Sequence, residues 1–303
     1  MTFSQLRTFV EVAKRGSVTG AAAALFVTEP SVSAAVAALQ EEIGVPLVRR
    51  AGRGIELTAA GEVFARHAAE ILGLADRARR AAQEVAGRPG VLRIAAVTTA
   101  GEYVLPPLLA IFRARFPEVQ VVLQVGNRAE AFAALEANAV DLVIGGRPPV
   151  GGRLKGEPVF ESELVVVAGP DHPLSRKRLV EAPDLSAQTW LLREEGSGTR
   201  EATDGYLAAY EIEPAATMVI GSNAAIKRAV AADLGITLMQ LDAVAAEIAT
   251  QRLSRIRAQG TPLKRLWHVL YRDPDALPPA ATAFLALLRS PAGRRALASA
   301  EHA

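Results

Sequence analysis

A proline-free run from Thr58 to about Ala86 sets the strictest limit on how this chain can fold. Its apolar residues keep the spacing of one helix face, so the run predicts a single long helix. An N-terminal domain of roughly sixty residues is too small to cover that face, and we therefore expect the helix to pair with a second copy. The face consists of Val63, Phe64, Ala68, Ile71, Leu72, Ala75, Ala78, Ala82 and Val85.

The helix divides the chain into three parts: residues 1–58, the helix over 59–87, and residues 88–303. At 303 residues the chain exceeds one hydrophobic core of ordinary size, which also favours more than one domain. Gly87 and Pro89 end the helix and predict a hinge before the third part.

Residues 1–58 have the pattern of three short helices and a β-hairpin. Gly16 ends the first helix, Ser17 and Thr28 are placed to cap the second and third, and Pro30 falls in the third helix's first turn. This order predicts a winged helix-turn-helix, whose third helix reads base edges in the major groove of DNA. The candidate DNA contacts on that helix are Thr28, Glu29, Pro30, Ser31, Ser33 and Ala34.

Two short apolar segments around the turn 51–54 predict the wing. Arg49, Arg50 and Arg53 concentrate positive charge there, where it can contact phosphates or enter a minor groove. A solvated arginine cluster on a small helical domain is the alternative. The formal net charge of +2 does not decide between them, so a local arrangement of arginines has to supply any attraction for DNA.

The order of these motifs resembles the DNA-binding domain of LysR-type transcriptional regulators over residues 3–61. The resemblance implies a double-stranded promoter as partner. The chain departs from the usual family pattern at Thr28-Glu29 and Ser33-Ala34, and Glu29 either accepts from a cytosine amino group or repels phosphate. The matching motifs are Leu6-Arg7-Thr8-Phe9, Gly16-Ser17-Val18-Thr19, Ala21-Ala22, Pro30-Ser31-Val32-Ser33, Leu39-Gln40-Glu41 and Leu57-Thr58-Ala59-Ala60-Gly61.

Residues 88–303 alternate buried strands with helices, which predicts parallel α/β architecture. We expect two lobes, the first over about 91–162 and 267–295 and the second over about 163–266, with a ligand cleft between them. The fold class expected for the whole chain is therefore α/β, with a winged helix-turn-helix, a long linker helix and a two-lobed effector domain like periplasmic binding proteins. The predicted strands are 91–97, 119–125, 140–145, 163–169, 189–192, 217–220, 236–239 and 266–271.

Four turns near the predicted cleft share one chemistry, because each stands just before a helix and carries hydroxyl or amide side chains. Helix N-termini and arginines favour negative charge, so we expect a small anionic effector, phosphorylated or carboxylated. The alternative is that these residues only cap helices and form turns. The candidate contacts are Thr98, Thr99, Asn127, Arg147, Ser197, Thr199, Arg200 and Asn223.

The third part also resembles LysR-type effector domains, and more narrowly those of the subgroup that regulates carbon-fixation operons. The motifs are Asn127-Arg128 and the runs 141–149, 193–200 and 221–227. The resemblance implies phosphorylated sugars or nucleotide-type metabolites as effectors, a tetramer built from two dimers, and control of carbon metabolism. Control of sulfur, nitrogen or other metabolism through a carboxylate effector stays open.

An enzyme and a solute-binding protein are the competing functions. The four histidines have no metal spacing, Ser197 lacks the context of a nucleophile elbow, and there are no cysteines, so we expect neither catalysis nor a metal or cofactor. The N-terminus carries no secretory signal and no apolar run is long enough to span a membrane. We therefore expect a cytoplasmic, DNA-binding regulator without a membrane partner.

Overall fold

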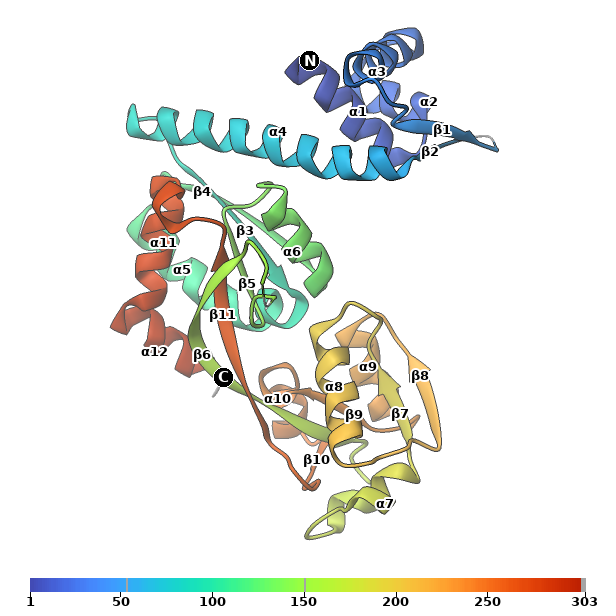
Figure 1. Cartoon of the computed structure of the whole chain (residues 1–303). Helices are drawn as coiled ribbons and strands as arrows, with labels where there is room; N and C mark the ends of the chain where they lie inside the picture. The colour runs from blue at the N-terminus through green and yellow to red at the C-terminus, as the bar shows by residue number, and fades with distance from the viewer. Residues whose placement is uncertain (53, 150, 301–303) are drawn as a thin grey trace. The chain divides into compact units, whose positions relative to one another are not determined.

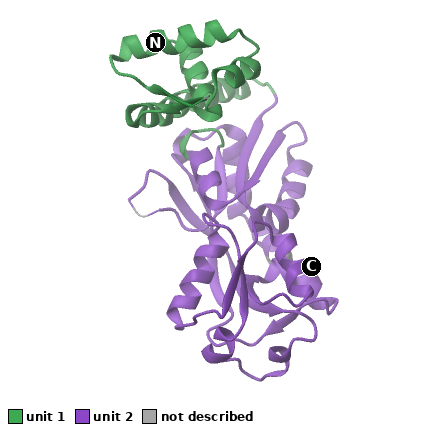
Figure 2. Ribbon diagram, turned by 90° about the vertical axis from the view of Figure 1, so that its right-hand side faces the viewer, with its two compact units in different colours: residues 1–88, 136–140 green, residues 89–135, 141–303 purple. Residues whose placement is uncertain are grey.

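The structure, a computed structural model, describes residues 1–52, 54–149 and 151–300 in two compact units. Unit 1 comprises Met1–Arg88 with Glu136–Val140, and unit 2 comprises Pro89–Leu135 with Asp141–Ala303 (Figure 2). Arg53, one of the predicted DNA contacts, lies outside the described residues.

Unit 1 begins with three helices and a two-stranded antiparallel hairpin, as the sequence predicts for a winged helix-turn-helix. The predicted caps are present: the Ser17 hydroxyl accepts from the Gly20 amide, and the Thr28 hydroxyl accepts from the Ser31 amide. Gly16 ends the first helix in the left-handed region at φ 60°, which glycine adopts without strain. The elements are α1 (Phe3–Arg15), α2 (Val18–Leu25), α3 (Glu29–Ile43), β1 (Val48–Ala51) and β2 (Gly54–Leu57).

The wing is attached to the helices by hydrogen bonds of the Gln40 and Thr58 side chains, and an apolar core packs beneath it. The core includes Phe9 and Leu39, which are fully buried. The Gln40 side-chain oxygen accepts from the amides of Leu47 (2.8 Å) and Val48 (3.0 Å), at the start of β1. The Thr58 hydroxyl donates to a carbonyl ahead of β1 and also caps the following helix. These bonds fix where the wing stands relative to α3.

The predicted long helix is confirmed as α4 (Ala59–Val85), which has 27 residues and therefore a length of about 40 Å. Val63, Ile71, Leu74 and Val85 on it remain substantially exposed, at 48%, 40%, 52% and 79%. Their spacing places them on one side of the helix. Within the described residues, these four apolar side chains are thus left exposed on one side of α4.

Unit 2 is built on a mixed seven-stranded sheet with the order β10-β6-β11-β5-β3-β4, in which β9 also pairs with β6. The predicted parallel arrangement is right for β3, β4 and β5, but β6 and β11 run antiparallel to their neighbours. The sequence does not predict this, because the direction of β6 and β11 is set by pairing between residues far apart in the chain. The bounds are β3 (Val91–Val97), β4 (Gln120–Gly126), β5 (Leu142–Gly145), β6 (Lys155–Ala168), β9 (Thr237–Gln240), β10 (Ser254–Ile256) and β11 (Leu263–Tyr271).

The strands β6 and β11 run through two lobes, as Figure 1 shows, and each lobe has its own apolar core. In the first lobe, helices cover β3, β4 and β5. The second lobe also contains the parallel pair β7 (Thr189–Leu192) and β8 (Ala216–Val219). The helices of unit 2 are η1 (Ala100–Val104), α5 (Leu105–Arg115), α6 (Arg128–Glu136), η2 (Pro173–Arg176), α7 (Ala182–Ser186), α8 (Gly198–Ala209), α9 (Asn223–Ala231), α10 (Leu241–Ala249), η3 (Pro274–Ala276), α11 (Pro279–Arg289) and α12 (Pro291–Ala300).

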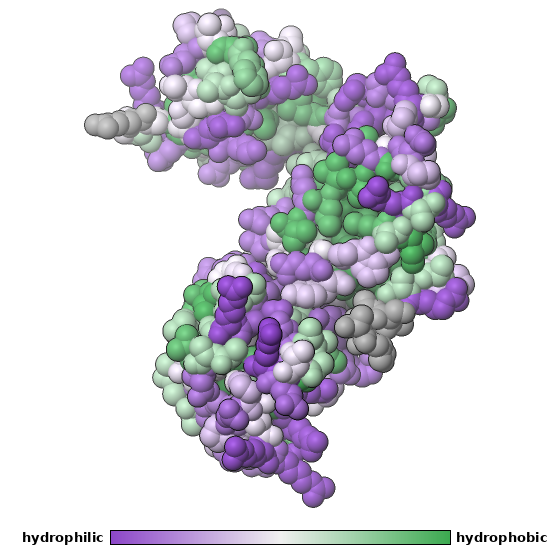
Figure 3. Space-filling model, turned by 180° about the vertical axis from the view of Figure 1, so that it is seen from behind, coloured by the Kyte–Doolittle hydropathy of each residue, from purple (hydrophilic) through white to green (hydrophobic). Residues whose placement is uncertain are grey.

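The surface is mostly hydrophilic, but Figure 3 shows apolar side chains gathered near the middle of the view from behind. Among the described residues, no single helix is long and apolar enough to cross a membrane. Only α2 and α3 taken together reach that length, and the chain bends by 109° between them.

Candidate functional site

A small pocket lies between the two lobes of unit 2, and we call it the inter-lobe pocket. Its volume is about 10 Å³, room for about one water molecule. The carboxyl ends of β3 and β4, the start of α8 and the strand β11 all contribute to it. Its lining residues are Val97, Thr98, Thr99, Asn127, Arg128, Arg193, Ser197, Gly198, Thr199, Arg265 and Trp267.

Several lining residues also form hydrogen bonds to the backbone near the pocket. The Thr98 hydroxyl donates to the Gly126 carbonyl (3.2 Å), and the Ser197 hydroxyl accepts from the Thr199 amide (3.3 Å). Asn127 and Glu130 form a reciprocal cap at the start of α6, in which each side chain accepts from the other residue's amide at 2.9 Å. The capping roles are therefore present, and they hold these polar groups at the pocket wall.

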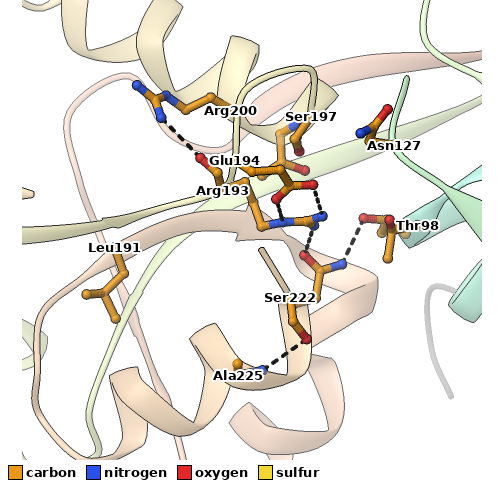
Figure 4. A network of polar contacts seen from close by, with 12 residues as sticks. Thr98, Asn127, Leu191, Arg193, Glu194, Ser197, Arg200, Ser222 and Ala225 are labelled. Atoms are coloured by element: carbon orange, nitrogen blue, oxygen red, sulfur yellow. Dashed lines mark hydrogen bonds and ion pairs between the residues drawn. The ribbon is translucent and has the colours of Figure 1, made fainter. Parts of the chain in front are cut away.

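A chain of polar contacts behind the pocket joins the lobes (Figure 4). Arg193, which is 4% exposed, donates to both carboxylate oxygens of Glu194 (2.7 and 2.9 Å) and to the side-chain oxygen of Asn223. The Asn223 amide nitrogen then donates to the Thr99 hydroxyl of the first lobe at 3.4 Å. Burial raises the pKa of Glu194, but the hydrogen bonds from Arg193, a backbone hydrogen bond and the charge of Arg193 together leave this pKa below its usual value.

Arg128 forms a second link between the lobes. Its guanidinium, at the start of α6 in the first lobe, is paired with the carboxylate of Glu201 on α8 in the second. It also donates to the Arg147 carbonyl (3.0 Å) and lies 5.1 Å from the centre of the Phe132 ring. Because 65% of the Glu201 side chain is exposed, this ion pair contributes only about 0–1 kcal/mol.

Arg265 reaches the pocket from β11 and is held by backbone and an aromatic ring. Its guanidinium lies 5.3 Å from the centre of the Trp267 ring, and Nη1 donates to the Gly198 carbonyl at 3.1 Å. A Cβ added to Gly198 would stand 2.8 Å from Arg265 Nη2, and one added to Gly146 would stand 3.0 Å from it. The two glycines therefore leave the space that this side chain occupies.

The charge of Arg265 has no direct counter-ion among the described residues, since none of their carboxylates pairs with it within 4.0 Å. Burial lowers the pKa of Arg265; the carboxylate of Glu201 raises it and the charge of Arg128 lowers it further. The guanidinium stays protonated at neutral pH because its usual pKa is so high. The indole Nε1 of the neighbouring Trp267 is also buried without a hydrogen-bond partner in the described part of the chain.

The structure brings together five of the eight predicted effector contacts: Thr98, Thr99, Asn127, Ser197 and Thr199. The remaining three lie elsewhere. Asn223 is buried behind the pocket, Arg147 lines an open groove of about 810 Å³, and Arg200 borders another hollow while binding Asp204 and the Arg193 carbonyl.

Four further lining residues are not among the contacts predicted from the sequence: Arg128, Arg193, Arg265 and Trp267. For Arg193 a signal existed, because it directly follows the buried strand Thr189–Leu192 at its carboxyl end. Arg265 carries no such signal, since it lies within a strand and its neighbours at the pocket come from distant parts of the chain.

The predicted DNA contacts in unit 1 form an exposed surface. Thr28, Glu29, Pro30, Ser31, Ser33 and Ala34 are all exposed at the start of α3. Arg49 and Arg50 are exposed on β1, and Arg49 pairs across the hairpin with Glu56 at 2.9 Å. The described residues contain no group of three or more side chains suited to a metal ion.

Comparison with known proteins identifies both units. Residues 3–62 match the family model for the bacterial regulatory helix-turn-helix protein, lysR family, and residues 86–292 match the LysR substrate binding domain. A RuBisCO operon transcriptional regulator of Allochromatium vinosum is 37% identical over 97% of this chain and 97% of its own length.

Two solved structures extend the comparison. The Synechocystis CcmR regulatory domain in complex with 2-PG is 32% identical, with a TM-score of 0.62 over 65% of this chain and 95% of that chain. Full-length CbnR complexed with target DNA is 26% identical, with a TM-score of 0.67 over 95% of this chain and 99% of that chain. The winged helix-turn-helix, the two-lobed unit and these matches over nearly the whole length place the chain in the LysR family of bacterial transcriptional regulators.

Proposed function

We propose that this chain binds promoter DNA and that a small anionic metabolite, held between the lobes of unit 2, modulates that binding. The inter-lobe pocket carries the proposal, because three arginines meet the N-terminus of α8 there. Free amides and the positive end of a helix dipole favour an anion, and guanidiniums add directed donors. Closure of the lobes around the metabolite would change the angle between the paired DNA-binding domains of a dimer, and with it the bend of the promoter DNA.

The metabolite belongs to carbon metabolism in this proposal. The relative from Allochromatium vinosum is named for the RuBisCO operon, and the CcmR domain was solved with 2-PG. Neither name points to sulfur or nitrogen metabolism. We therefore take 2-PG as the first candidate effector.

The proposed polar contacts are the five predicted residues that line the pocket, Thr98, Thr99, Asn127, Ser197 and Thr199, to which we add Arg193 and Arg265. Arg147 and Arg200 would reach only a ligand that extends beyond the pocket. Asn223 acts indirectly, since it bonds Arg193 and Thr99.

The proposed DNA contacts are the exposed residues of α3 named above, with Arg49 and Arg50 of the wing; Arg53 stays a prediction from the sequence. The proposed parts are the DNA-binding domain 1–58, the dimerisation helix 59–87 and the effector domain 88–303. The exposed apolar residues of α4 support a homodimer, which would read a two-fold related site. A tetramer of two such dimers completes the proposal.

The same proposal makes the chain a binding protein, not an enzyme, with no cofactor or metal. It acts in the cytoplasm, where the promoter is. A family of transcriptional regulators supports each of these points.

Footprinting on the chain's own upstream DNA tests the proposal, with and without 2-PG and a panel of phosphorylated sugars and organic acids. We expect sequence-specific protection whose length or bending changes with one anion. If the protein binds no DNA sequence specifically under any condition, the proposed regulatory function is wrong. If it binds DNA but no anion changes that binding, only the proposed anionic effector is wrong.

A further inference from the structure

The cations of the inter-lobe pocket differ in what balances their charge. Arg193 is held by both oxygens of Glu194, and Arg128 is paired with Glu201. Arg265 has no such partner among the described residues, and it lines both the inter-lobe pocket and the open groove beside it. A partly buried guanidinium without a carboxylate is unfavourable in a folded protein unless another anion offsets it.

The surroundings of Arg265 hold it in place without neutralising it. Gly146 and Gly198 leave room for its nitrogens, the Gly198 carbonyl accepts from Nη1, and the Trp267 ring lies beneath the guanidinium. These contacts come from the end of β5, the start of α8 and β11 itself. Of its five N–H groups, only one donates a hydrogen bond to another described residue, so the others are left to serve a ligand.

We propose that Arg265 is the residue through which the pocket recognises the charge of its effector. This inference rests on the proposed function, and it narrows that function to effectors carrying a compact anionic group that fits between Arg265 and the N-terminus of α8. A neutral molecule of the same shape is rejected because it leaves the guanidinium uncompensated. Neither Arg147 nor Arg200 has this role, since both lie outside the pocket.

Calorimetric titration of the full-length protein with 2-PG, and separately with inorganic phosphate, tests the inference. We expect Arg265→Met, which keeps the aliphatic stem over Trp267, to weaken binding by about 10- to 100-fold. Arg265→Lys, which keeps the charge without the planar fork, should show a smaller loss. Arg147→Met, which removes an exposed cation of the neighbouring groove, should bind within about 2-fold of the wild type.

Gly198→Ala provides a second variant that leaves every charge in place. The added Cβ displaces the Arg265 side chain, so we expect it to weaken binding as well, while footprinting of the ligand-free protein on its upstream DNA is unchanged. Unchanged affinity in Arg265→Met, with a wild type that binds, would overturn this inference and leave the proposed function standing. A wild type that binds neither 2-PG, phosphate nor any other anion of the panel would overturn the proposed anionic effector, and this inference with it.

Discussion

At the scale of single residues, the arginines in and beside the inter-lobe pocket differ in their counter-ions. The sequence alone does not distinguish the arginines at 128, 193, 200 and 265. In the described structure the first three are paired with a carboxylate, and Arg265 is not. Position in the pocket alone does not separate them, because Arg128 and Arg193 line it as well. The uncompensated charge has a consequence for stability.

We predict that Arg265→Met raises the free energy of unfolding of the ligand-free protein by about 1 kcal/mol. Removing a partly buried, unpaired charge relieves its desolvation, and this outweighs the lost hydrogen bond to Gly198. Urea denaturation monitored by circular dichroism measures the change, with Arg200→Met as control, because that substitution breaks an ion pair with Asp204 and gains nothing. A loss of 1 kcal/mol or more would mean that Arg265 serves the fold.

At the scale of elements, the sequence predicts features that depend on neighbouring residues, but not those that depend on packing between distant residues. Ser17 and Thr28 cap their helices as predicted, because a cap depends on residues only three positions away. The antiparallel course of β6 and β11 was not predicted, since strand direction is set by pairing between residues about a hundred positions apart.

The candidate site divides in the same way. Polar residues at helix starts were predicted, and five of them line the pocket. Arg265 was not, because its environment depends on Gly146, Gly198 and Trp267 meeting through tertiary packing. Arg147 and Arg200 were predicted from their charge and turn position, but their side chains point to other hollows.

The link between α3 and the wing leads to a second prediction. Gln40→Ala removes the acceptor of two amides at the start of β1, so we expect it to destabilise unit 1 by about 1–3 kcal/mol and to weaken DNA binding. Thermal unfolding and gel-shift titration measure the two effects. Glu41→Ala, on the exposed side of the same helix, should change neither stability nor DNA affinity appreciably.

His268 on β11 makes the unfolding free energy depend on pH. Burial lowers the pKa of His268; a hydrogen bond to the Leu266 carbonyl opposes this, and the charges of Arg147 and Arg265 lower the pKa further. Between this lowered pKa and the usual value near 6.5 the unfolded chain binds more protons, so stability falls as pH falls through that window. We expect His268→Gln to flatten the decline in unfolding free energy below pH 7. Equal slopes in both proteins would contradict it.

At the scale of the whole molecule, the exposed apolar side of α4 is the surface through which we propose that copies of the chain associate. Val63, Ile71, Leu74 and Val85 remain exposed on one side of a helix about 40 Å long, which is a costly arrangement for a chain that stays alone. Two DNA-binding domains joined through such helices bind two half-sites together, and each then raises the effective concentration of the other.

We predict that Leu74→Asp converts the protein to a monomer at micromolar concentration and weakens promoter binding by at least about 10-fold. A carboxylate on the apolar side of α4 cannot be buried against a second copy without a large desolvation cost. Sedimentation velocity measures the association state. Gln83→Asp introduces the same charge on another side of the helix and should stay dimeric; a dimeric Leu74→Asp protein would place the dimer interface elsewhere.

The small size of the inter-lobe pocket bears on when the regulator responds. In the proposed function, a metabolite enters this pocket, which has room for about one water, only after the lobes part. The bonds of Asn223 to Thr99 and of Arg128 to Glu201 oppose that parting. The concentration at which a cell's metabolite is detected then depends on how often the lobes part as well as on how well the pocket holds its ligand. A substitution at Glu201, which lies outside the pocket, would therefore change the metabolite concentration at which the regulator responds. It would leave the residues that select the metabolite unchanged.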